Sequence, residues 1–69
     1  MVEIFRTNVE NKNDAEMAIN YLKTNLPHTI INFDLEDCDR ILRVENIIIN
    51  EVYEFQLLVK TLGFICSHI

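Results

Sequence analysis

The fold is decided by residues 29–45, which read Thr29-Ile30-Ile31-Asn32-Phe33-Asp34-Leu35-Glu36-Asp37-Cys38-Asp39-Arg40-Ile41-Leu42-Arg43-Val44-Glu45. Apolar and polar side chains alternate in both halves of this stretch, which is the period of a half-buried β-strand. Residues 36–39, three of which are acidic, form a polar turn between the two halves. The stretch therefore predicts a β-hairpin whose inner face carries Ile31, Phe33, Leu35, Leu42 and Val44.

A strand and a helix are predicted before the hairpin. Residues 2–9 are rich in β-branched and apolar side chains, as strands are. Either Asn11 or Asn13 can then cap the N-terminus of a helix. That helix would bury one stripe with three-and-four spacing and would end at Pro27, because the residue before a proline disfavours helical angles. The predicted stripe consists of Ala15, Ala18, Ile19, Leu22 and Leu26.

A second helix and a last strand are predicted after the hairpin. Asn50 is the candidate N-cap, with Glu51 placed favourably against the helix dipole. Gly63 ends the helix, since glycine tolerates a left-handed cap, and residues 64–69 form the strand. The predicted buried stripe consists of Ile48, Val52, Phe55, Val59 and Leu62.

These elements follow one another as strand, helix, strand, strand, helix, strand. That order predicts an α+β fold, a ferredoxin-like βαββαβ sandwich formed by a single domain, residues 1–69. Its antiparallel sheet would have the strand order 4-1-3-2, with both helices on one face. The other face of the sheet would then be uncovered.

Composition limits the classes of partner. The chain has 69 residues, with six basic and eleven acidic side chains and a net charge of -5. A basic patch for nucleic acid or for an anionic membrane surface is lacking, and no apolar run reaches the roughly 18 residues of a membrane span. The start of the chain lacks the basic and apolar regions of a signal peptide. We therefore expect a cytoplasmic protein with free thiols at Cys38 and Cys66.

Four segments resemble the heavy-metal-associated (HMA) domain family, the fold of copper chaperones and of metal-ATPase N-terminal modules. They are residues 31–36, residues 42–45, Leu26-Pro27 and Leu62-Gly63-Phe64. The resemblance covers nearly the whole chain. It implies the same ferredoxin-like fold that the order of elements predicts.

The metal motif of that family is absent from its place. The family carries Met-x-Cys-x-x-Cys in the first loop, where two thiolates bind a soft cation such as Cu(I). In this chain Val9 falls at the methionine, and Asn11 and Asp14 fall at the two cysteines. The resemblance therefore implies a degenerate member without the family's metal site.

Other residues leave a metal-binding alternative open. Cys66 and His68 lie two apart on the last predicted strand and project to one face, so they could bind zinc or Cu(I) with help from Cys38. Two ligands make only half a zinc site, and free cysteines are mostly buried hydrophobic residues. The acidic residues 34–39 lack the glycine and distal glutamate of an EF-hand loop and are interpreted as a solvated turn.

No catalytic constellation is visible, so we expect no enzyme activity and no cofactor. Acylphosphatases share the fold and use arginine and asparagine, but Arg6 and Asn32 lack the accompanying phosphate-binding loop. A small-ligand regulatory domain of the same topology is a weaker alternative. The first loop of such domains usually contains glycine, and the first loop of this chain has none.

The uncovered sheet face gives the first hypothesis for function. Period-two alternation predicts that apolar side chains from all four strands face outward, with Arg43 at the rim. Exposed apolar patches of this kind mark partner or self-association surfaces. The chain is therefore predicted to be a small non-enzymatic interaction module that binds a protein partner or itself; a heavy-metal (Cu or Zn) binding or delivery protein is the alternative. The predicted contact residues are Val2, Ile4, Ile30, Ile41 and Ile65.

Overall fold

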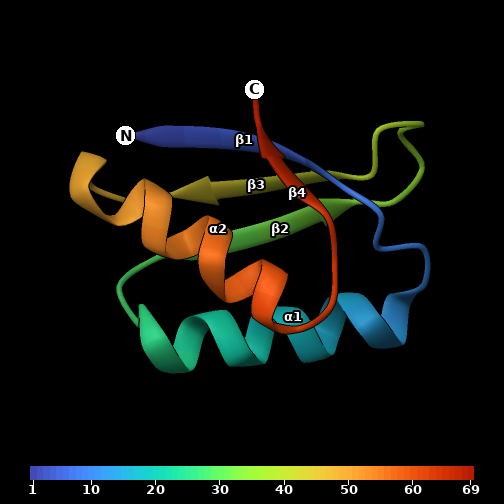
Figure 1. Cartoon of the computed structure of the whole chain (residues 1–69), viewed down its shortest axis with the longest axis horizontal. Helices are drawn as coiled ribbons and strands as arrows, with labels where there is room; N and C mark the ends of the chain where they lie inside the picture. Colours follow the sequence, from blue (N-terminus) through green and yellow to red (C-terminus); the bar gives the residue numbers. More distant parts are fainter.

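The computed structural model describes residues 1–69, and it has an α+β architecture. Strands β2, β3, β1 and β4 lie in that order in one antiparallel sheet, and helices α1 and α2 lie together on one side of it (Figure 1). The predicted order 4-1-3-2 is confirmed, because it is the same order counted from the other edge, and the arrangement is consistent with a ferredoxin-like fold. The elements are β1 Val2–Thr7, α1 Lys12–Asn25, β2 Ile30–Asp34, β3 Ile41–Glu45, the 3-10 helix η1 Ile49–Glu51, α2 Val52–Thr61 and β4 Cys66–His68.

The core lies between the two helices and the inner face of the sheet. Phe5 of β1 and Phe55 of α2 stack with ring centroids 5.1 Å apart, and both are fully buried. Packing of this kind between aromatic rings adds to the stabilisation that comes from burying their apolar area. The whole cluster consists of Phe5, Leu22, Leu26, Ile31, Leu42, Val44, Ile47, Phe55, Val59 and Cys66.

Helix α1 begins as the sequence predicts, with Asn11 rather than Asn13 as its cap. The Asn11 side-chain oxygen accepts a hydrogen bond from the Asp14 backbone N–H at 2.8 Å, which satisfies one of the free donors of the first turn. The helix ends at Asn25, and the Leu26 N–H still donates to the Leu22 carbonyl. Pro27 follows immediately, at the predicted end.

The start of the second helix differs from the prediction. Asn50 does not cap it; a turn of 3-10 helix, Ile49–Glu51, precedes α2, and the Glu51 carboxylate accepts from the Ile48 N–H at 3.1 Å. Ile48 is exposed, and the buried residue is its neighbour Ile47. The prediction failed because the run Ile47-Ile48-Ile49 contains no polar residue that fixes which isoleucine faces the core.

The last strand is shorter than residues 64–69. Only Cys66–His68 pair regularly with β1, although the Ile69 N–H also donates to the Ile4 carbonyl. Gly63, which follows α2, has φ +94, a left-handed conformation that glycine adopts at little cost. Neither helix has both the length and the apolar character needed to cross a lipid bilayer.

Candidate functional site

The sheet face opposite the helices is formed by every second residue of each strand. The inward residues Phe5, Leu42 and Ile31 are buried, so their strand neighbours point to the other side. The register aligns the outward residues in rows that run across the strands: Ile30, Glu45 and Val2 in one row, and Asn32, Arg43 and Ile4 in the next. Beyond these rows, Asp34 lies opposite Ile41, and Arg6 lies opposite Ser67.

Apolar, polar and charged side chains are mixed in these rows. Glu45 separates Ile30 from Val2, and Arg43 lies 3.6 Å from Glu45 through its Nη1 atom. Ile4 and Ile41 are partly buried, whereas Val2, Ile30 and Ile65 are 45%, 54% and 63% exposed. The face therefore offers separate apolar contact points between charged side chains and does not form one continuous apolar patch.

The six residues predicted to form the contact surface belong to all four strands or their ends. Val2 and Ile4 lie on β1, Ile30 on β2, and Ile41 and Arg43 on β3. Ile65 precedes β4, and its N–H donates to the Asn8 side-chain oxygen at 2.8 Å. Five of the six residues therefore lie on strands of the sheet, and Ile65 lies immediately before the last strand.

Asn11 and Asp14, which the resemblance aligns with the HMA cysteines, are hydrogen-bonded to each other. Besides the cap bond, the Asn11 amide nitrogen donates to the Asp14 carboxylate at 3.0 Å. Val9, which the resemblance aligns with the HMA methionine, is fully buried, and its N–H donates to the Thr7 hydroxyl oxygen at 3.2 Å. The loop thus directs the side chains at positions 11 and 14 toward one point, where in this chain they cap a helix.

Cys66 and His68 both contact other parts of the fold, Cys66 in the core and His68 at Glu3. Cys66 is buried in the core, and burial raises the pKa of its thiol to about 11 despite the opposing charge of Lys60. His68 contacts the Glu3 carboxylate through Nε2, and its ring lies 5.0 Å from that of Phe5. A buried, protonated thiol is a poor metal ligand, because the thiolate is the form that binds.

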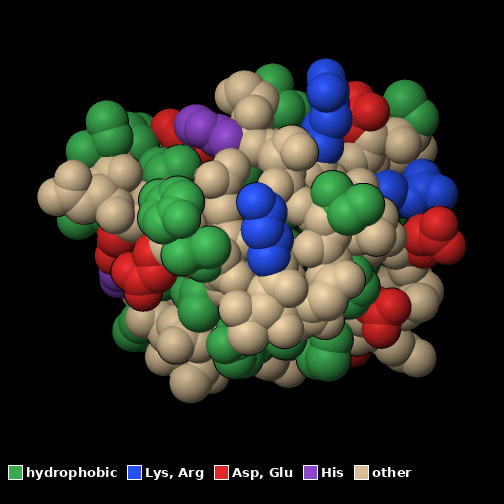
Figure 2. Space-filling model, in the orientation of Figure 1, with side chains coloured by type: hydrophobic (Ala, Val, Ile, Leu, Met, Phe, Trp, Pro, Cys, Tyr) green, Lys and Arg blue, Asp and Glu red, His purple; other side chains and the backbone are tan.

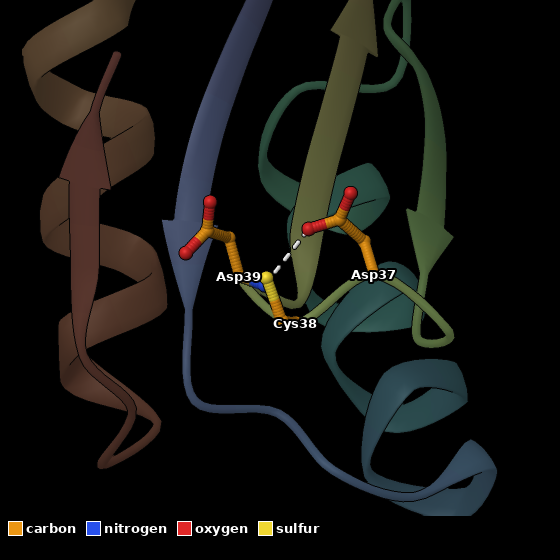
Figure 3. A group of neighbouring side chains, drawn as sticks. All are labelled: Asp37, Cys38 and Asp39. Carbon is orange, nitrogen blue, oxygen red and sulfur yellow. Dashed lines mark hydrogen bonds between the residues drawn. The ribbon is translucent and has the colours of Figure 1, made fainter.

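Cys38 lies apart from these two residues, in the turn between β2 and β3. Figure 3 shows it between Asp37 and Asp39, and the ligand atoms of the three residues lie within 4.8 Å of one another. The Asp39 N–H donates to the Asp37 carboxylate at 2.8 Å, and the Asp39 carboxylate lies 3.6 Å from Arg6 Nε. These contacts explain the cluster as a hydrogen-bonded turn.

The turn that carries Cys38 lies at the same end of the sheet as the first loop. The Thr7 N–H donates to the Asp39 carbonyl at 3.2 Å, and the Thr7 hydroxyl donates to the Arg40 carbonyl at 2.7 Å. Arg6 is therefore paired with an acidic turn, and Asn32 lies opposite Arg43. Arg6 and Asn32 are two strands apart in the sheet order, and no pocket opens on the surface.

Sequence reasoning missed one group of exposed residues, on α2 and η1. Ile49, Tyr53 and Leu57 are large, apolar and exposed. Their signal in the sequence was the four-residue spacing, which places Tyr53 and Leu57 on one side of α2, with Ile49 in the 3-10 turn before it. The predicted buried stripe of this segment did not include these three residues, and no other role was predicted for them.

His28 pairs with a residue that is distant in the sequence. Its Nε2 atom lies 2.8 Å from Glu51 Oε1, so the loop before β2 is joined to the start of α2. This hydrogen bond, with that from the Ile48 N–H, lowers the pKa of Glu51 from its ordinary value of 4.5. The pairing spans 23 residues, and no local pattern reports it.

No family model, curated protein or solved structure matches this chain. The resemblance to the HMA domain family accordingly stays a prediction drawn from the residues of the hairpin and of the helix ends.

Proposed function

We propose that this chain is a small, non-enzymatic protein-binding module of HMA-like, ferredoxin-like fold that works without a metal ion. The observation that carries the proposal is the uncovered sheet face, on which Val2, Ile30 and Ile65 are exposed between charged neighbours. Exposed apolar side chains set among charged groups support a binding role, because protein interfaces combine apolar anchors with polar groups. The two free cysteines suit a reducing, cytoplasmic compartment.

The composition of the face favours a protein as partner. Arg43 and Glu45 bring both signs of charge into the centre of the sheet, next to Ile4 and Val2. Interfaces between proteins combine apolar anchors with polar groups that fix their orientation. A sheet face or a helix with complementary charges is the kind of surface that fits.

The test compares the wild-type chain with Ile30→Asp as bait in crosslinking under native conditions. Ile30 contributes an exposed side chain on an edge strand, so the substitution leaves the core intact. We expect the proteins crosslinked to the wild type to be lost with Ile30→Asp and kept with Met17→Asp, a matched change of an exposed residue on α1. Equal recovery with both variants contradicts the use of the sheet face.

The alternative is a heavy-metal binding or delivery protein that uses Cys66, His68 and Cys38. It has less support, because Cys66 is buried among apolar side chains and His68 contacts Glu3. Titration of the reduced protein with Cu(I) and Zn(II) under a competing chelator tests it. Stoichiometric binding that disappears in Cys66→Ser would favour the alternative over the protein-binding module.

A further inference from the structure

Helix α2 and the 3-10 turn before it carry a second apolar stripe, which faces water. Ile49, Tyr53 and Leu57 follow one another at intervals of four residues and are 76%, 69% and 44% exposed. Figure 2 shows hydrophobic side chains gathered over the N-terminal half of α2. Phe55 and Val59 are the residues of the same helix that are buried in the core. The exposed stripe therefore does not contribute to the core of the fold.

The charges beside the stripe indicate what covers it. Glu54 lies three residues before Leu57 and Lys60 lies three residues after it, and both are exposed. Residues three apart share one side of a helix. The stripe therefore has an acidic group toward one end and a basic group toward the other, at equal distances from Leu57.

We propose that α2 pairs with α2 of a second copy of this chain, antiparallel and with Leu57 on the two-fold axis. In a symmetric pair, residue i of one copy meets residue j of the other and the reverse. With Leu57 on the axis, Glu54 of each copy meets Lys60 of the other, which makes two equivalent ion pairs. Tyr53 meets Thr61, whose hydroxyl already donates to the Leu57 carbonyl at 2.8 Å and can accept from the tyrosine.

The charges on α2 are compatible with self-association through this surface. The chain has a net charge of -5, so two copies repel each other over most of their surfaces. The stripe itself is balanced, with one acidic and one basic flanking group. A second copy brings the complementary sign to each flank, and no other partner needs to be assumed for the match.

The pairing goes beyond the proposed function and uses a different side of the molecule. The helices cover one face of the sheet, and the contact residues proposed above lie on the other. A dimer through α2 therefore leaves both sheet faces free, one per copy. The module would present two identical binding faces, which raises avidity for a partner with two sites.

The experiment is sedimentation equilibrium over a series of concentrations that reaches the millimolar range. One short helix per copy makes an interface at the small end of specific ones, so we expect a monomer–dimer equilibrium. Leu57→Asp should abolish the dimer, because it places two carboxylates together on the axis. Glu54→Lys or Lys60→Glu alone should weaken it about tenfold by turning two attractions into repulsions, and the double variant Glu54→Lys/Lys60→Glu should restore it.

Controls separate this result from loss of fold and from the sheet face. Lys23→Glu makes the same charge change in the last turn of α1 and should leave the dimer unchanged; circular dichroism checks that each variant is folded. Three results would overturn the proposal: a wild type that stays monomeric, a double variant that fails to restore the dimer, or a dimer that only Ile30→Asp disrupts. The last result would leave the sheet face as the association surface, so the two proposals fail separately.

Discussion

Placing the two cysteines of the HMA motif in the first loop tests the resemblance directly. In the double variant Asn11→Cys/Asp14→Cys, the thiols replace two side chains that already approach to 3.0 Å. The loop geometry is fixed by the bond from the Val9 N–H to Thr7 and by the buried Val9 side chain. We therefore expect the reduced variant to bind one Cu(I), since two thiolates suit a soft cation.

The change in melting temperature of the cysteine variant follows from the loss of the Asn11 cap and from the binding of the metal. Removing the Asn11 cap costs about 1 kcal/mol, which lowers the melting temperature of a domain of this size by roughly 4–8 °C. A metal at a free concentration of 100 times its dissociation constant adds about 2.7 kcal/mol. The apo variant should thus melt below the wild type, and the metal-loaded variant above it.

The assay is thermal unfolding of the reduced protein with and without Cu(I), with binding measured against a competing chelator. Asn11→Ser/Asp14→Ser is the matched control, because serine has the shape of cysteine, keeps the cap and lacks the thiolate. A cysteine variant that folds but binds no more Cu(I) than the serine variant would refute the reasoning. It would mean that the first loop does not have the geometry of the family's site.

Three further outcomes are expected from single groups. Cys38 should react with a thiol reagent at once and buried Cys66 only on unfolding, because burial raises the pKa of the Cys66 thiol to about 11; equal rates in the folded protein would contradict this. Glu51 has a lowered pKa in the folded state, so its contribution is present above about pH 4.5 and lost as the pH falls below it; the difference in denaturation midpoint between wild type and Glu51→Gln should shrink in that range, and a difference independent of pH would refute it. Phe55→Ala should lower the free energy of unfolding, measured by urea denaturation, by about 3–5 kcal/mol, because Phe55 is fully buried against Phe5. A loss below about 1 kcal/mol, close to that of a surface substitution, would show that the core is not centred there.

The sheet could be predicted because its signal is local. Alternation in residues 29–45 determines the hairpin and its inner face, and one polar turn fixes the pairing. The order of elements then leaves few ways to arrange four strands, so the sheet order follows. The start of α2 could not be predicted in the same way, because Asn50 lies inside a 3-10 turn, Ile49–Glu51, which the Glu51 carboxylate closes by accepting from the Ile48 N–H.

The candidate sites depended on long-range contacts that no spacing reveals. The pairings of His68 with Glu3 and of His28 with Glu51 span 65 and 23 residues. His68, a candidate metal ligand, and His28 therefore join segments that are distant in the sequence. Similarly, the cap formed by Asn11 and Asp14 gives a structural reason for the residues that stand where cysteines were expected.

The small size of the chain connects the two proposed surfaces. Only 15 of the 69 residues are buried, and a domain of this length has marginal stability from its core alone. Ten large apolar side chains stay exposed, and they include Ile30 on the sheet and Tyr53 on α2. A dimer would cover the helix side and add free energy of folding by mass action. The sheet side, with its alternating charges, would then be left for a partner that supplies complementary ones.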